Sequence, residues 1–349
     1  MNSSAIVPGR NSTESGDSLF NRGRNRNMMA GIAVFLYLVV IPLVFQSHNY
    51  IIGIVSTISI LALISLGVWI TFSIGRINIG QGAFALIGGY TTAILSTRYG
   101  VSFWLCLPLS GLVSGLLGFL LGWPILRLKG VYFSMITLSI TEATRLTFLS
   151  GGKFTGGAFG ILEVPRPGDL SLFGLKIIPA FGGADPLSFY YLAAVLLLFG
   201  LAVVWRLSSC KIGAVFQSMR QNEELASSIG INVAKYRVMA YVICCFLGGL
   251  GGAYFAAYQQ NIFPGTFQIN DSIFFMLYCF LGGLDYVLGP IVGTILLFVS
   301  FETLHAIQQY QPLIYGILMI VLILWLPDGI LSLGSKRRKA GVEPDKSGP

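Results

Sequence analysis

Two charged residues inside an apolar stretch are the clearest candidates for chemistry in this sequence. Glu142 and Arg145 are three residues apart, so they can meet on one face of a helix. A charged side chain costs roughly 2.5–3.5 kcal/mol at the centre of a membrane-spanning helix, so we expect the pair to face a polar interior, a partner or each other. Two interpretations stay open: a local pair that anchors the helix end, or a carboxylate that borders a solute path together with the hydroxyl of Thr137.

Residues for catalysis are missing from the sequence. His48 and His305 lie in different regions, and neither joins a carboxylate-and-nucleophile or metal-binding pattern. The 5 cysteines lack the spacing of a zinc site or a disulfide framework. Lys153 follows two glycines, but the hydroxyl that completes a phosphate-binding loop is absent after it. We therefore expect no catalytic residue, no metal and no cofactor, and any nucleotide that drives this protein must bind another chain.

Hydrophobic composition sets the fold class. The chain has 349 residues, of which 54% are hydrophobic and 10% are charged, whereas soluble domains carry about 25% charged residues. Its uncharged runs are long enough for helices of about 20 residues to cross a bilayer, and they are continuously apolar rather than alternating, which favours helices over a barrel. The sequence predicts an all-α polytopic transmembrane helix bundle with about ten spans, an arrangement that would fit two inverted halves. These spans lie near residues 28–46, 51–74, 79–97, 101–125, 130–149, 187–205, 238–259, 271–284, 288–304 and 312–331.

Positive charge is distributed unevenly along the chain, whose formal net charge is +8. With ten spans, 17 of the 22 Lys and Arg fall on one side of the membrane, including the cluster Lys336–Lys339 after the last span. Basic residues gather in cytoplasmic loops, so both termini are predicted to be cytoplasmic, and a nucleic-acid partner is disfavoured. Residues 1–27 are predicted to be a disordered cytoplasmic tail, residues 28–333 the transmembrane domain, and residues 334–349 a basic cytoplasmic tail.

Glycines interrupt two of the predicted spans. The third span opens with Asn78, Gly80 and Gln81, and the eighth ends in Gly282 and Gly283. If spans two to five repeat as spans seven to ten, the two interruptions hold corresponding positions. Short, glycine-interrupted spans at matching positions of two halves indicate a transport path, although glycines also allow helices to pack closely in lipid.

The predicted outer loop, residues 150–186, is rich in glycine and proline. Gly156 and Gly157 permit tight turns with exposed backbone N–H groups. Such groups suit contact with an anionic ligand or a delivering protein, and a plain connecting loop explains them equally well. The candidate residues of the translocation path are Asn78, Gln81, Thr137, Glu142, Gly156, Gly157, Gly282 and Gly283.

A polar insert, residues 206–237, separates two apolar runs. Turns between spans need only a few residues, so an insert of this length favours a docking surface for a soluble partner. Its composition predicts two short helices with a turn at Gly230. Such a helix can lie in a groove on a soluble domain or on the membrane surface, but adjacent glutamates and few lysines make a poor lipid binder. The expected apolar stripe consists of Met219, Leu225, Ala226 and Ile229, opposite Arg220, Asn222, Glu223 and Glu224.

Motifs in a fixed order give most of the chain a recognisable pattern. From about Ile51 to Leu333, they resemble the membrane subunits of ATP-binding-cassette importers for branched-chain amino acids, of the kind that pairs with a second, shorter permease. The motifs lie within Asn78–Tyr90, Pro124–Phe133, Thr137–Arg145, Thr155–Ile161, Gly213–Gly230, Leu281–Gly293 and Trp325–Leu331.

The resemblance implies partners and a site. A second permease, two ATP-binding subunits and a periplasmic substrate-binding protein would complete an importer of branched-chain or related amino acids in the lipid bilayer of the bacterial inner membrane. The insert would carry the coupling helix, because Glu224-Leu225-Ala226 followed by Gly230 resembles the Glu-Ala-Ala…Gly signature of importers. The residues that the resemblance assigns to coupling with the ATP-binding subunits are Gly213, Arg220, Asn222, Glu223, Glu224, Ala226 and Gly230.

Two alternatives remain beside this interpretation. Relatives in the family carry urea or short-chain amides, and residues 284–286 replace the small residues that usually follow Gly283, so the substrate stays open. A stand-alone ion-coupled secondary transporter is the alternative of another class. Scarce intramembrane carboxylates and the length of the insert speak against it, and no filter motif of a channel is visible.

Overall fold

The computed structural model describes residues 37–38, 41–45, 48–172, 175–178 and 186–303, with 313, 316–317, 320 and 329–331. The chain divides into two compact units, residues 1–52 and 53–349. The described part of the first unit holds the short helix α2 (Ile41–Phe45) and the first residues of α3 (Asn49–Ser73). Most of the first and last predicted spans and both predicted tails lie outside the described residues.

Helices occupy the ranges predicted for the second to the ninth span, so the prediction of a mainly helical bundle is confirmed. By length and composition, four described helices are able to cross a membrane: α3, α5 (Phe103–Ile125), α7 (Pro186–Ser209) and α10 (Val233–Gln259). The remaining helices at these ranges are shorter or less apolar. They are α4 (Gln81–Tyr99), α6 (Val131–Ser150), α11 (Ile269–Gly282) and α12 (Gly289–Thr303).

The core of the second unit is built around α10, which packs against α4 and α5. Small residues allow these backbones to approach closely, as in other membrane helices. A Cβ added to Gly88 would overlap the backbone of Gly249. Further along, the ring of Tyr241 stands edge-on to Phe84 at 5.6 Å and to Phe133 at 6.1 Å, so α4 and α6 are held against the same helix.

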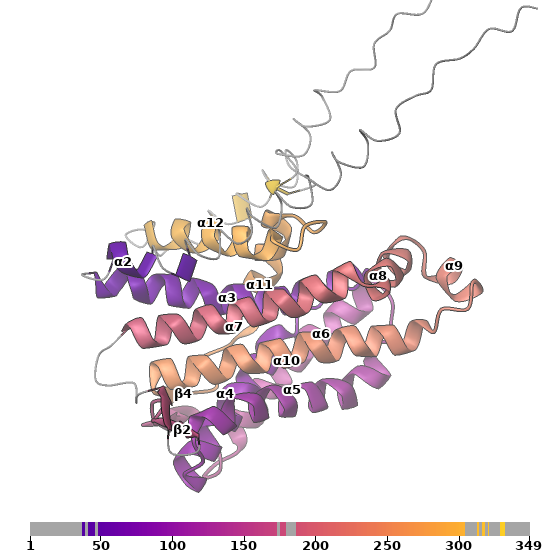
Figure 1. Cartoon of the computed structure of the whole chain (residues 1–349). Coiled ribbons are helices and arrows are strands. Elements are labelled where there is room, and N and C mark those ends of the chain that lie inside the picture. The colour runs from indigo at the N-terminus through magenta and orange to yellow at the C-terminus, as the bar shows by residue number, and fades with distance from the viewer. Residues whose placement is uncertain are drawn as a thin grey trace, which may run out of the picture. The chain divides into compact units, whose positions relative to one another are not determined.

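The second unit has different structures at the two ends of its helices (Figure 1). The short helices α8 (Lys211–Gln221) and α9 (Glu223–Ser228) lie at one end, which we call the insert end. The strand pair β1 (Ile161–Leu162) and β4 (Asn261–Ile262) lies at the opposite end, which we call the strand end.

The strand end departs from the all-α prediction, because the predicted outer loop carries short regular elements. β1 and β4 pair antiparallel although about a hundred residues separate them in the chain. Gly160 precedes β1 and Pro165 follows it, so this short stretch is extended and pairs with β4. Residues 150–186 also contain the 3-10 turn η2 (Gly157–Phe159), β2 (Leu170–Leu172) and β3 (Leu175–Ile178), with β2 and β3 antiparallel, whereas β4 follows α10.

The polar insert consists of α8 and α9, since α7 continues to Ser209 and α10 already begins at Val233. Asn222 separates the two helices with an extended backbone (φ −155°, ψ 109°). Its side-chain Oδ1 accepts hydrogen bonds from the N–H groups of Glu224 and Leu225, both at 3.0 Å, which is the capping role that Asn favours. The predicted turn at Gly230 is present, with φ +87°.

The single apolar stripe predicted for the insert is wrong. Because Asn222 ends α8, Met219 lies on a different helix from the other three members of the stripe. Met219 and Ala226 are buried, whereas Leu225 and Ile229 are exposed. The insert therefore buries one apolar set against the bundle and presents another outward.

Candidate functional site

The helix α4 begins inside the bundle rather than at its end. Residues 76–80, which we call the interhelix segment, are non-helical. The side-chain Nε2 of Gln81, the first residue of α4, donates to the carbonyls of Ile64 (3.1 Å) and Cys244 (3.0 Å). Ile64 lies nine residues before the end of α3, and Cys244 eleven residues after the start of α10. At 1.5 Å per residue, both carbonyls lie about 14–17 Å from the insert end.

Three candidate path residues meet around this break. Asn78, Gln81 and Thr137 are all fully buried. Asn78 Oδ1 accepts from the N–H of Gly80 at 2.9 Å, and Thr137 Oγ1 accepts from the N–H of Ile79 at 3.1 Å. These polar groups therefore satisfy backbone donors that the missing helical turn leaves without partners.

The thiol of Cys244 completes this polar cluster. Its Sγ donates to Gln81 Oε1 at 2.9 Å and accepts from Asn78 Nδ2 at 3.3 Å. No local pattern predicts this contact, because a cysteine in an apolar span has the pattern of a small core residue. The cluster holds α10 against both sides of the break.

The second interrupted helix, α11, begins beside the first. The N–H of Gly82, in the first turn of α4, donates to Ser272 Oγ in the first turn of α11 at 2.9 Å. Asp271 Oδ2 accepts from the N–H of Gln268 at 2.7 Å and closes a capping box. α4 runs toward the strand end and α11 toward the insert end, so two helices start side by side and diverge. Sequence reasoning missed Ser272, which belongs to no local motif.

The other candidate path glycines shape turns. Gly283 has φ +111°, and a Cβ on Gly282 would overlap the carbonyl of Gly289, so both allow α11 to turn sharply into α12. Gly156 (φ +79°) and Gly157 (φ +58°) form the turn before β1. Backbone conformation and close approach account for these four positions, and none of them lines a pocket described below.

Glu142 and Arg145 form the local pair that their spacing predicts. Arg145 Nε donates to both carboxylate oxygens of Glu142 at 3.0 Å, and Nη2 donates to Oε1 at 2.5 Å. Both side chains are half-buried. The opposite side of α6 buries Thr137 and Thr141 against the interhelix segment, so the ion pair lies toward the surface of this chain.

A groove of about 490 Å³ lies between the interhelix segment, α6 and α11. Its lining is apolar except for Ser134, whose hydroxyl donates to the carbonyl of Ile77 at 2.8 Å. The groove therefore lies where the two interrupted helices and the helix with the ion pair meet. The lining residues are Gly75, Ile77, Ile79, Gly130, Val131, Ser134, Met276 and Phe280.

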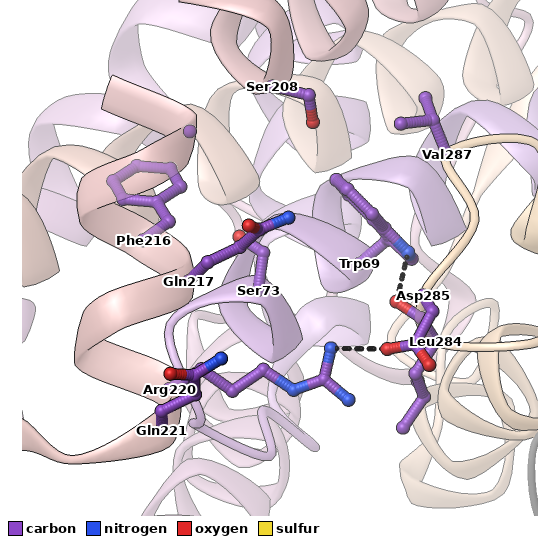
Figure 2. Close-up of a pocket in the computed structure, with 11 residues that line it drawn as sticks. Trp69, Ser73, Ser208, Phe216, Gln217, Arg220, Gln221, Leu284, Asp285 and Val287 are labelled. Carbon is purple, nitrogen blue, oxygen red and sulfur yellow. Dashed lines mark hydrogen bonds and ion pairs between the residues drawn. The ribbon is translucent and has the colours of Figure 1, made fainter. Parts of the chain in front are cut away.

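A second pocket, of about 620 Å³, opens at the insert end between α3, α7, α8 and the turn after α11. Figure 2 shows Arg220 of α8 reaching across it to Asp285, with Nη1 and Oδ1 at 2.8 Å. Trp69 Nε1 donates to the carbonyl of Leu284 at 3.0 Å. Asp285 therefore contacts the insert, and Leu284 contacts α3.

The two glutamates of the insert have opposite environments. Glu223 Oε2 pairs with Arg76 Nη2 at 3.1 Å, and its Oε1 contacts Arg237. The side chains of Glu223, Arg76 and Arg237 are only 23%, 5% and 13% exposed. Burial lowers the pKa of Arg76 below its usual value, so a nearby carboxylate is needed to stabilise its charge. Glu224 instead has an 86% exposed side chain and a 3.4 Å contact with Lys129.

Helices that begin inside a bundle are a feature of many membrane transport proteins. Residues 50–324 match the family model described as "Branched-chain amino acid transport system / permease component". This match covers most of the chain, which therefore belongs to that permease family. No solved structure matches the chain significantly.

Curated relatives carry the same description. The chain is 36% identical over 276 residues to the high-affinity branched-chain amino acid transport system permease protein LivM of Salmonella typhimurium, and 35% identical to LivM of Escherichia coli. Both matches cover 74% of this chain and 64% of the relative, so the chain spans less than two thirds of their length. A probable LivH of Methanocaldococcus jannaschii is 27% identical, covering 80% of this chain and 91% of the relative.

Proposed function

We propose that this chain is a membrane-spanning permease subunit of an ATP-binding-cassette importer that carries branched-chain or related amino acids. The family match over residues 50–324 and the similarity to LivM support this function. The partners are a second permease, two ATP-binding subunits that hydrolyse ATP, and a periplasmic substrate-binding protein. The chain itself needs neither a catalytic residue nor a cofactor.

The proposed topology has ten spans, with both termini on the cytoplasmic side of a bacterial inner membrane. In this topology residues 28–46 and 312–331 supply the outermost spans, between cytoplasmic tails 1–27 and 334–349. The insert within residues 206–237 is cytoplasmic, and the loop 150–186 faces outward. The paired starts of α4 and α11, which run in opposite directions, support two inverted halves.

We place the translocation path along the groove and the exposed side of α6. α5 exposes only apolar side chains, among them Leu112 and Leu116, and such a surface suits lipid. α6 instead presents Glu142 and Arg145 about 17 and about 21 Å from its start, where contact with lipid is costly. That side of α6 should therefore face the second permease or the solute.

In this proposal the other candidate path residues position the helices around the path and do not contact the solute in the conformation described. Asn78, Gln81 and Thr137 hold the wall behind the groove through the buried hydrogen bonds around the start of α4. Gly156, Gly157, Gly282 and Gly283 set the turns at the two ends of the path.

We propose that the exposed side of α9 and its C-terminal turn contacts the ATP-binding subunit. Leu225 and Ile229 are 64% and 70% exposed beside the exposed Glu224, and α9 lies at the far end of the insert (Figure 1). Exposed apolar residues on a polar hairpin indicate an interaction surface. The other coupling candidates give the hairpin its shape: Gly213 packs closely, Asn222 caps α9, Ala226 is buried and Gly230 forms a turn. Arg220 connects the hairpin to the bundle through Asp285.

A cross-linking experiment tests this coupling surface. A single cysteine at Ile229, in a Cys210→Ser background because the other described cysteines are buried, should cross-link to an ATP-binding subunit in membranes. The matched control is a cysteine at Phe159, which is 85% exposed in the proposed outer loop and should not react with that subunit. Equal cross-linking from both positions, or none from Ile229, would contradict the proposal.

A further inference from the structure

Glu223 lies between two arginines that belong to different parts of the bundle. Arg76 follows α3 and opens the interhelix segment, and Arg237 lies in the second turn of α10. We propose that these three residues form an ionic anchor that ties α9 to the interhelix segment, so that Glu223 positions the coupling insert from inside and does not contact the ATP-binding subunit. This inference rests on the proposed function, and it assigns to Glu223 a role different from that of Glu224.

Hydrogen bonds extend the anchor to a third connection. Arg76 Nη1 donates to the carbonyl of Leu128 at 2.7 Å, and Arg237 Nη1 donates to the carbonyl of Leu126 at 3.0 Å. Both carbonyls belong to the turn between α5 and α6. The anchor thus joins the start of α9, the end of the α3 region, the α5–α6 turn and the start of α10.

The charges of the anchor are unequal, with one carboxylate facing two guanidinium groups. Buried charges are stable only with good geometry and further hydrogen bonds, and the two carbonyls supply such bonds. Removal of the carboxylate would leave two like charges close together with little water. Glu223 is therefore the residue on which the anchor depends, whereas the exposed Glu224 and Lys129 gain little from each other.

The anchor is directly connected along the chain to the buried cluster around Gln81, because Arg76 lies two residues before Asn78. Arg76 is followed directly by Ile77, Asn78 and Ile79, which bond to α6 and to Cys244. Preceding it, Gly75 lies against the backbone of Arg220 in α8, since an added Cβ would be 3.4 Å from its Cα. A displacement of α9 would therefore move the interhelix segment at the start of α4.

The test compares Glu223→Gln with Glu224→Gln in the importer assembled with its ATP-binding subunits and reconstituted in liposomes. Three quantities are measured: co-purification of the ATP-binding subunits, ATP hydrolysis, and solute molecules taken up per ATP hydrolysed. Glu223→Gln should keep the ATP-binding subunits bound but lower uptake per ATP by tenfold or more. Glu224→Gln should instead weaken that association, so that fewer ATP-binding subunits co-purify.

Milder variants keep the test decisive if Glu223→Gln fails to accumulate. Glu223→Asp and Arg76→Lys retain the charges of the anchor. Lysine lacks the planar guanidinium that lets Arg76 bond to both Glu223 and Leu128. Uptake per ATP should therefore fall to an intermediate value in these variants. Release of the ATP-binding subunits by Glu223→Gln, or unchanged coupling in all these variants, would overturn the anchor.

Failure of the proposed function would look different. If the unsubstituted chain binds no ATP-binding subunit, that function is wrong, and the anchor is then tested by hydrogen exchange of the purified chain. The anchor requires faster exchange of α9 amides in Glu223→Gln than in Glu224→Gln. Equal exchange in the two variants would contradict it.

Discussion

The backbone N–H of Gly82 donates a 2.9 Å hydrogen bond to the hydroxyl of Ser272, although the two residues are 190 positions apart. The bond joins the first turn of α4 to the first turn of α11. Each turn begins a helix with unpaired N–H groups, so a hydroxyl at this place satisfies one donor inside the protein. The two interrupted helices are therefore parts of one structural unit.

Substitutions at this contact should lower stability in a non-additive way. Ser272→Ala leaves the buried N–H of Gly82 unpaired, which costs about 1–3 kcal/mol. Gly82→Ala places a Cβ 2.5 Å from Ser272 Oγ and should also lower the melting temperature of the purified protein in detergent. The double variant Gly82→Ala with Ser272→Gly removes the clash and should melt above Gly82→Ala alone. A Gly82→Ala protein as stable as the parent would disprove the contact.

Gln81 should contribute more to stability than an exposed glutamine. Gln81→Leu removes two hydrogen bonds from Nε2 to the carbonyls of Ile64 and Cys244, each of which contributes about 0.5–1.5 kcal/mol. The matched control is Gln259→Leu, at an exposed position near the end of α10. Thermal unfolding should separate the two variants clearly, and equal melting temperatures would show that the buried cluster does not hold the start of α4.

The ion pair between Arg220 and Asp285 should matter more for uptake than for the stability of the protein. The pair is partly exposed, and such pairs contribute about 0–1 kcal/mol, so single charge reversals should change melting little. Uptake should fall in Arg220→Asp and in Asp285→Arg, because α8 loses its contact with the turn after α11. Uptake by the Arg220→Asp/Asp285→Arg double variant should recover toward the parent value. A double variant no better than either single variant would argue against this contact.

Substitution of Glu142 should show whether its pair with Arg145 borders the translocation path or only stabilises α6. Glu142→Gln leaves the charge of Arg145 unpaired about three quarters of the way along α6, so transport should change in KM or in maximal rate if that side borders the path. The Glu142→Gln/Arg145→Gln double variant carries no unpaired charge and should accumulate to higher levels than the single variant. Reduced expression with an unaltered KM in Glu142→Gln would assign the pair to anchoring alone.

Local signals predicted the helices well. The run at 101–125 contains no charge and became α5 from Phe103 to Ile125, because a continuously apolar stretch of that length has few other stable forms. The break at Asn222 was also accessible, since Asn followed by two glutamates is a favourable helix start. The predicted stripe across it failed because helical spacing was extended through a capping residue.

No local sequence pattern predicted the contacts between residues that are far apart in the chain. Glu223 and Arg76 are 147 positions apart, and nothing in either local sequence indicates their pairing. Helical spacing predicts Glu223 and Glu224 together on the polar side of the insert, but the fold buries most of Glu223 and leaves Glu224 exposed. The pairing of β1 with β4 and the position of Ser272 are further results of tertiary packing that short-range patterns do not encode.

Reconstituted transport tests the central claim most directly, namely that this chain is a passive membrane subunit driven by ATP hydrolysis elsewhere. Liposomes would contain this chain with its second permease and ATP-binding subunits, and the substrate-binding protein would deliver radiolabelled leucine. Uptake should require ATP and every added subunit, and should be absent with this chain alone. Uptake by the purified chain alone, driven by an ion gradient without ATP, would contradict the account.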